Sequence, residues 1–351
     1  MTVQCYLPYT DAQLERLPRS MAEYARWQST ETELNPFLGR FHWVLQTQLH
    51  LQAAGVDARL TNRLEAAGVL YSHVECLTYG IRPLKDQVLI AALVDKDIPL
   101  PHAFLHITHN PVQRLPFFAR YRYLDPWPQI GLIPRNPKRG PRFENVYFMG
   151  NPEHLHPFFL STYFTDELQQ LGLRLVVPRP NEWHDFSEAD CLIAVRNFGT
   201  SMTHLQRPAL KLFNAWLAGI PAILGYESAY RHRGKINSDY LEVQSESEVI
   251  QRLKYLADHV GARQVLTGNG EVRAREITGH AVRDRWIRLL EDLIYPHFKK
   301  LRGNQACRVQ ALTMGSLRER VLWRLPGRFR QNRAEMSFPH QRKPTITDEH
   351  D

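Results

Sequence analysis

Two basic side chains flank the predicted start of a helix in the second half of the chain. Arg207 and Lys211 are four residues apart, around Pro208, so both side chains fit on one side of the first helical turn. The first amides of a helix lack partners within it and carry the positive end of its dipole, which suits a phosphate or diphosphate. Arg196 follows a predicted strand and adds a planar guanidinium for the same oxygens. These residues predict an anion site.

A sharp turn brings further polar residues to the same place. The predicted helix over residues 208–218 stops at Gly219, and Gly219 and Pro221 lead into a predicted strand over residues 222–224. That strand delivers Glu227 and Ser228 to the crevice where the helix starts. We expect Glu227 either to contact a bound substrate or to cap the segment after it, and Ser228 to help bind a nucleotide.

The elements that must position these residues form two α/β halves. Short apolar runs alternate with helical stretches over residues 1–125 and again over residues 143–300, which predicts two Rossmann-like lobes. Between them, residues 126–142 hold five prolines and two glycines, a density that stops helices and central strands, so we interpret them as the crossing between lobes. A basic, partly helical and then disordered tail is predicted over residues 301–351.

Other polar residues follow predicted strands, where ligands of doubly wound sheets bind. Asp95 comes after the apolar run at residues 88–94, and His109 after the run at 103–108, so each is a candidate general base. The sequence does not choose between them. Trp183 follows a predicted strand of the second lobe and could frame a nucleotide base or ribose.

The run K-L-x-N-A-W-x-A-G-x-P-A-I-x-G, which begins at Lys211, resembles the helix–turn–strand signature of GT-B glycosyltransferases. The resemblance implies two Rossmann-like, doubly wound lobes facing a cleft, and hexosyl transfer from a nucleotide diphospho-sugar. It places Lys211 at the donor diphosphate. The family's E-x7-E pattern falls at Gln206 and Asn214, which are amides here, so inversion or retention stays open. An amide still hydrogen-bonds a ribose hydroxyl.

The resemblance also implies how the reaction is divided between the lobes. The donor binds the second lobe and an acceptor (a glycan, a lipid or a small molecule) binds the first. Arg196, Lys211 and the helix amides stabilise the leaving diphosphate, and Asp95 or His109 takes the acceptor proton. No cofactor and no metal are expected, because the D-x-D spacing of Asp95 and Asp97 lies in the first lobe and none follows a strand in the second.

Each candidate also fits a purely structural role. The alternatives are a solvated lysine for Lys211, an ion pair with Glu188 for Arg196, a core aromatic for Trp183 and a satisfied helix amide for Asn214. The function has alternatives too. An epimerase or a phosphorylase uses a similar scaffold and phosphate site. A non-catalytic protein that binds a nucleotide-sugar or glycan is favoured by the two amides, Gln206 and Asn214.

Charge and composition limit the partners and the compartment. The formal net charge is +8. The stretch between positions 297 and 333 contains ten Lys and Arg residues and a single acidic residue, Glu319. Such a stretch favours contact with an anionic membrane surface, whereas nothing resembles a nucleic-acid-binding module. There is no apolar run of membrane-spanning length, no signal-peptide pattern and no C-x-x-C pair among the four cysteines. We therefore expect a cytoplasmic protein, with a peripheral place at the inner membrane face as a further possibility.

Overall fold

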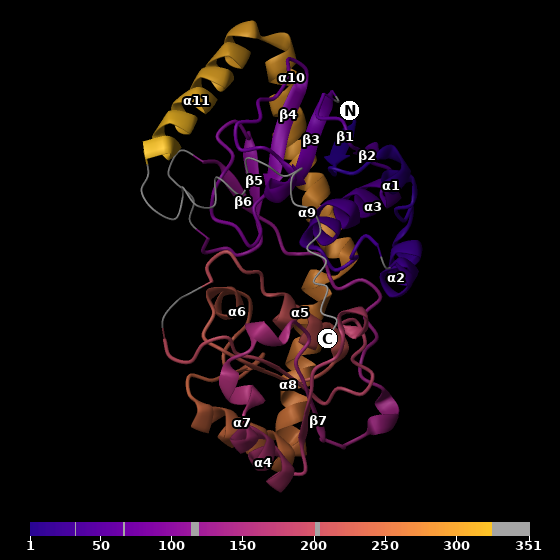
Figure 1. Ribbon diagram of the computed structural model, residues 1–351, viewed down its shortest axis with the longest axis vertical. Coiled ribbons are helices and arrows are strands. Elements are labelled where there is room, and N and C mark those ends of the chain that lie inside the picture. Colours follow the sequence, from indigo (N-terminus) through magenta and orange to yellow (C-terminus); the bar gives the residue numbers. More distant parts are fainter. Residues whose placement is uncertain (32, 66, 114–118, 201–203, 325–351) are drawn as a thin grey trace, which may run out of the picture.

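The computed structural model describes residues 1–31, 33–65, 67–113, 119–200 and 204–324. Its first sheet has six parallel strands in the order β2-β1-β3-β4-β5-β6 (Figure 1). The strands are β1 (Val3–Tyr6), β2 (Ala58–Thr61), β3 (Gly68–His73), β4 (Gln87–Ala92), β5 (Leu105–Thr108) and β6 (Tyr121–Tyr123). β3, β4 and β5 are buried along their whole length, which explains their near-continuous apolar sequences.

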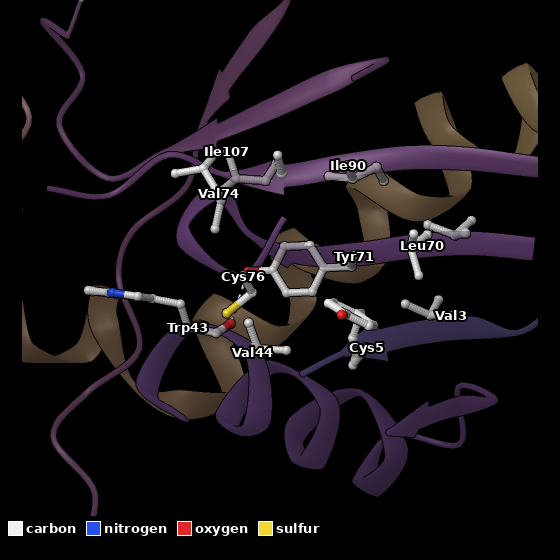
Figure 2. Close-up of a cluster of buried hydrophobic side chains, with 14 of the residues drawn as sticks. Val3, Cys5, Trp43, Val44, Leu70, Tyr71, Val74, Cys76, Ile90 and Ile107 are labelled. Carbon is white, nitrogen blue, oxygen red and sulfur yellow. Dashed lines mark hydrogen bonds between the residues drawn. The ribbon is translucent and has the colours of Figure 1, made fainter. Parts of the chain in front are cut away.

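The core of the first lobe forms where helices cover this sheet. One helical stretch on this sheet consists of the π-helical turn η1 (Phe41–Leu45) and α3 (Gln46–Ala53). Figure 2 shows Val44 of this stretch beside Tyr71 of β3, whereas the Trp43 ring points away from it. The Tyr71 hydroxyl donates a 2.9 Å hydrogen bond to the Trp43 carbonyl. This lobe also contains α1 (Asp11–Glu15) and α2 (Met21–Thr30).

The second sheet has five parallel strands in the order β11-β10-β9-β7-β8. They are β7 (Asn145–Tyr147), β8 (Arg174–Val176), β9 (Cys191–Ala194), β10 (Ala222–Leu224) and β11 (Leu241–Glu242). Its helices are α4 (Thr162–Gln170), α5 (Leu210–Ala218), α6 (Ser228–Arg233), α7 (Glu246–Asp258) and α8 (Val260–Ala274). The strand order reverses between β7 and β9, and ligands of doubly wound sheets bind at such a switch point. The two parallel sheets confirm the predicted α/β fold class.

The ends of α5 and α7 are set by single residues. α5 ends at Gly219, whose φ of +69° is the left-handed conformation that glycine adopts without strain. α7 begins at Ser245, whose hydroxyl accepts a 3.2 Å hydrogen bond from the Glu248 amide. Pro208 precedes the first helical residue of α5 by two positions, so the helix starts slightly later than predicted.

The last helices return to the first lobe. α9 (Gly279–Leu289), the π-helical turn η8 (Leu290–Ile294) and α10 (Tyr295–Gly303) place Val282, Trp286 and Phe298 in the hydrophobic core of the first sheet. This packing differs from the sequence-based boundary, which kept residues 143–300 together. α11 (Gln305–Arg324) then runs beside the first lobe, at the end remote from the second (Figure 1).

The predicted tail over residues 301–351 is described only as far as residue 324, so its part predicted to be disordered lies outside the described residues. Within the described part of the chain, every helix is too short or too polar to span a bilayer.

The carboxyl ends of the two sheets face each other. Asp95 and Asn110 follow β4 and β5 of the first lobe, and they contact Arg207 and Ser228, which follow β9 and β10 of the second. The Asn110 side chain donates to the Ser228 hydroxyl at 2.9 Å, and the Arg207 guanidinium lies 3.1 Å from the Asp95 carboxylate. The two sets of loops that the sequence analysis selected therefore meet between the lobes.

Candidate active site

An ion pair lies at the ends of two neighbouring strands in the second lobe. Arg196, two residues beyond β9, donates from Nη1 to Glu227 Oε1 at 2.7 Å, and Glu227 follows β10. Both side chains are largely buried, 16% and 5% exposed. The predicted alternative, a pair between Arg196 and Glu188, is wrong, because Glu188 binds Arg139 near the start of the lobe.

A small cavity opens over this pair. Its volume is about 180 Å³, and residues 196–199, His204 and residues 225–227 line it. Within the pair, Arg196 Nε and Glu227 Oε2 are buried and have no hydrogen-bond partner among the described residues. Burial lowers the pKa of Arg196, but attraction to Glu227 and to the Tyr230 hydroxyl outweighs it and holds the pKa above its ordinary value. The Arg196 guanidinium therefore stays charged beside the cavity, and two polar atoms of the ion pair are available to a ligand there.

Lys211 lies in the first turn of α5 and points at the loop after β7. Its ammonium donates to the Met149 carbonyl and lies 4.7 Å from the centre of the Phe148 ring. Burial, then repulsion from Arg196 and Arg207, lowers the pKa of Lys211 to about 7, with Glu227 opposing part of the shift. No carboxylate within ion-pair distance accompanies this ammonium among the described residues, so it is the least compensated cation of the group.

The backbone at Gly150 leaves room for this ammonium. A Cβ atom at Gly150 would lie 2.7 Å from Lys211 Nζ and 3.2 Å from the Phe148 ring, so a side chain there would displace the lysine. Gly150 follows β7, and Arg196 follows β9, on the two sides of the point where the strand order reverses. The first turn of α5 therefore faces the switch point, where the fold is expected to bind its ligand.

Arg207 and Gln206 lie just before α5 and contact the first lobe. Arg207 pairs with Asp95 across the lobes, and the Gln206 carbonyl accepts a 3.2 Å hydrogen bond from the Asp95 amide. Asp95 has a φ of +58°, which is uncommon for a residue other than glycine. The structure thus brings together Asp95, Gln206 and Arg207, which the sequence assigned to opposite lobes.

His109 is enclosed in the first lobe. Its ring is 2% exposed, stacks on Trp43 with centroids 4.7 Å apart, and bonds the Leu124 carbonyl through Nδ1 at 2.7 Å. Burial lowers the pKa of His109 to about 4. The imidazole is therefore neutral at pH 7, which is the form a general base requires.

Two of the predicted nucleotide contacts, Trp183 and Asn214, have different surroundings. Trp183 packs edge-on against Phe37 of the first lobe, with centroids 5.9 Å apart, and donates from its indole to the Pro178 carbonyl. Asn214, in the middle of α5, is 7% exposed, and its Oδ1 has no hydrogen-bond partner among the described residues. Ser228 is engaged by Asn110, as described above.

Several residues near the cations were missed from the sequence. His154 lies in the turn after β7, and burial together with Arg196, Arg207 and Lys211 lowers its pKa. His204 lines the small cavity, with a φ of +62° and its Nε2 3.3 Å from Asn197 Nδ2. The loop after β7 could have been selected from the sequence, because it follows the first strand of a doubly wound lobe.

Comparison with known proteins supports the architecture. No protein-family model and no curated protein sequence matches this chain. Among solved structures, Anabaena Alr3699/HepE in complex with UDP and glucose is 9% identical, with a TM-score of 0.51 over 84% of this chain and 100% of that chain. The same protein in complex with UDP-glucose is 10% identical and also has a TM-score of 0.51, over 83% of this chain and 99% of that one.

AviGT4, a glycosyltransferase involved in avilamycin A biosynthesis, is 11% identical and covers 86% of this chain and 98% of its own, with a TM-score of 0.46. At such identities the HepE comparison shows the fold alone. The chemistry has to be argued from the residues of the site. The chain has the GT-B fold, with two Rossmann-like, doubly wound lobes that face each other through the carboxyl ends of their parallel strands.

Proposed function

We propose that this protein is a glycosyltransferase that moves a hexosyl group from a nucleotide diphospho-sugar to an acceptor bound by the first lobe. The observation that carries the proposal is the desolvated ammonium of Lys211, which lies between Gly150 and Arg196 at the switch point of the second sheet. A cation without a carboxylate partner in such a place favours an anionic ligand. A diphosphate supplies the charge that the site lacks.

The reaction breaks the bond between the anomeric carbon and the β-phosphate oxygen. The electron pair of that bond leaves with the diphosphate, the acceptor oxygen bonds the anomeric carbon, and the acceptor proton passes to a base. Lys211, Arg196 and the first amides of α5 stabilise the growing phosphate charge. Removing one such donor costs roughly 2–4 kcal/mol in the barrier. Because these groups supply positive charge, we propose that transfer needs no metal.

We further propose that the nucleotide extends from this anion site along the start of α5. Arg207 and Gln206 border that path, Ser228 lies at the facing strand end, and Asn214 and Trp183 are the proposed ribose and base contacts. In the first lobe, Asp95 and His109 remain the two proposed bases. Asp95 is 37% exposed at the lobe interface, so it reaches an acceptor hydroxyl with less rearrangement than the enclosed His109.

The first donor to test is UDP-glucose, because HepE, which has the same fold, was solved with it. Thermal unfolding is followed with UDP-, GDP-, ADP- and dTDP-sugars. A ligand at about 100 times its dissociation constant stabilises the folded state by about 2.7 kcal/mol. Release of the nucleoside diphosphate is then measured with pooled glycan and lipid acceptors, and with Lys211→Met and Lys254→Met proteins as the site and control variants.

The outcomes separate the competing functions. Acceptor-dependent release that Lys211→Met abolishes and Lys254→Met preserves supports the proposal. Formation of an epimer from the donor alone indicates an epimerase, and consumption of glycan with inorganic phosphate indicates a phosphorylase. Donor-induced stabilisation with no product from any acceptor pool indicates a binding protein. Activity that EDTA abolishes and Mg²⁺ or Mn²⁺ restores contradicts metal independence.

A further inference from the structure

A groove of about 770 Å³ lies between α11 and the first sheet, away from the second lobe. Its floor is formed by the start of β4 and by residues just before β5 and β6, including Phe104 and Arg120. These are the amino ends of parallel strands, whereas Asp95 and Asn110 lie beyond the carboxyl ends. The groove is therefore at the opposite edge of the sheet from the candidate active site, and α11 passes beside it (Figure 1).

The groove is strongly cationic. Five of its described lining residues are Lys or Arg and none is Asp or Glu; the five are Lys85, Arg120, Lys300, Arg308 and Arg318. Nearby acids are already paired, Asp86 with Arg302, and Glu319 with Arg82 and His102. Arg318 Nε is buried without a hydrogen-bond partner among the described residues. Within the described parts of the chain, the cations of the groove thus lack a counter-ion.

Burial, and then the neighbouring Arg120, lowers the pKa of Arg318. Arg120 in turn lies over the Phe104 ring at 5.4 Å, and His297 stacks on the same ring at 3.6 Å. Two guanidinium groups held close to each other in a partly buried place repel unless an anion joins them. This excess of positive charge favours the binding of an acidic ligand.

The groove is also apolar, and α11 exposes apolar residues beyond it. The lining residues Leu84, Val309, Leu312 and Met314 are between 37% and 56% exposed. Leu317 and Val321 of α11, which do not line the groove, are 47% and 41% exposed. Inorganic phosphate would leave these apolar side chains exposed to water. A lipid would pair its phosphate with the cations and bury the apolar side chains against its hydrocarbon chain.

α11 is anchored firmly enough to form a stable wall. Leu322 is 1% exposed in the core of the first lobe, and Glu319 reaches His102 at 3.2 Å and Arg82 at 3.4 Å. At Gly315 a Cβ atom would lie 2.2 Å from His102 Nδ1, so the helix approaches the lobe more closely than any other residue would permit. The apolar groups on the other faces of α11 remain exposed.

We propose that this groove and the exposed face of α11 dock the protein on an anionic bilayer, with a lipid phosphate among Arg120, Arg318 and Lys300 and the acyl chain against Leu84 and Leu312. The sequence placed membrane contact in the tail as a whole. The structure assigns it to a defined groove instead. The contact is independent of the donor site, so its test needs no turnover.

The test is flotation of the full chain with vesicles of phosphatidylcholine alone and of phosphatidylcholine mixed with phosphatidylglycerol. Two double variants remove groove charge, Arg120→Gln/Arg318→Gln and Lys85→Gln/Lys300→Gln, the second at two exposed lysines. Arg252→Gln/Lys254→Gln on α7 removes the same charge from the second lobe. Leu84→Asn/Leu312→Asn tests the apolar wall. Thermal unfolding of each variant verifies that it is folded.

We expect binding only to the anionic vesicles, weakened roughly 10- to 30-fold by each groove charge pair, since each basic residue near an anionic surface contributes about fivefold. The α7 pair should bind like the wild type, and the apolar pair should bind more weakly. Groove variants that bind normally while truncation after residue 324 abolishes binding overturn the proposal in favour of the tail. Stabilisation by inorganic phosphate without any vesicle binding overturns it as well.

Discussion

Arg207 and Asp95 join the two lobes at the candidate active site. The guanidinium of Arg207, before α5, lies 3.1 Å from the carboxylate of Asp95, after β4, and the Asp95 amide donates to the Gln206 carbonyl. Arg207, which borders the proposed nucleotide path, and Asp95, a proposed acceptor base, are thus each other's counter-ions. A bound donor must compete with the Asp95 carboxylate for Arg207.

Asp95→Asn separates the roles of this carboxylate. The Asn side chain keeps the shape of the aspartate but removes its charge, so Arg207 becomes available to the donor. UDP should then bind up to about fivefold more tightly, which corresponds to the interaction free energy of an exposed ion pair. If Asp95 is also the base, turnover falls by about 100-fold or more. Calorimetric titration of UDP and initial-rate kinetics measure the two effects.

Asp57→Asn is the matched control, because Asp57 is 41% exposed in the first lobe and pairs with Arg59 at 2.7 Å. It should change neither UDP affinity nor turnover. Tighter UDP binding with normal turnover assigns the proton transfer to another residue, with His109 as the next candidate. Unchanged UDP affinity in Asp95→Asn shows that the pair does not restrain Arg207.

Lys211→Met should leave the fold intact and lower turnover by about 100-fold or more, because it removes a preorganised cation from the leaving group. Met keeps most of the packing of the lysine chain against Phe148. Thermal stability at pH 6 should not fall, since the variant no longer buries a charge without a carboxylate partner. Kinetics and thermal unfolding, with Lys254→Met as the exposed control, test this. Normal turnover in Lys211→Met removes the lysine from the mechanism.

The helix–turn–strand around Lys211 could be predicted because its signals are local. The cap at Gly219, the apolar strand before Arg196 and the strand after Pro221 each depend on neighbours in the sequence, and all are present. The rule that ligands lie beyond the carboxyl ends of parallel strands then selected Arg196 and Glu227 as residues of one crevice. Fold class followed from the same alternation of apolar runs.

Long-range contacts could not be predicted in this way. Nothing near Trp286 or Phe298 shows that α9 and α10 return to the first sheet, since an amphipathic helix fits either lobe. Charge partners are equally non-local. The sequence suggested Glu188 as a partner of Arg196 because it is near in the chain, whereas the pairing of β9 with β10 brings Glu227 alongside. His154 and His204 belong to short turns whose direction depends on that packing.

Donor affinity should depend on pH through Lys211. Burial lowers its pKa to about 7 in the free protein, and a bound diphosphate favours the ammonium form and raises the pKa again. Binding therefore takes up a proton above pH 7, and affinity falls by up to tenfold per pH unit as the pH rises from 7 toward the pKa of the complex. Titration calorimetry with UDP at pH 8, in buffers of different ionisation enthalpy, measures the uptake. Lys211→Met should bind UDP weakly and show no such uptake, and an equal uptake in that variant would assign the proton elsewhere.

Asp125→Asn should loosen the second junction between the lobes. The Asp125 carboxylate is 4% exposed and lies 3.0 Å from Arg233 of α6 and 2.7 Å from Arg285 of α9, and it also accepts from the Tyr123 hydroxyl. Among the described residues, replacing it leaves the Arg285 guanidinium without a carboxylate partner and Arg233 with Glu276 alone, 3.5 Å away. This change should lower the free energy of unfolding by roughly 1–3 kcal/mol. Urea unfolding measures this as a lower midpoint with an unchanged slope. Asp258→Asn, at the exposed end of α7, should unfold like the wild type, and an equally stable Asp125→Asn protein would show that these pairs contribute nothing to the junction.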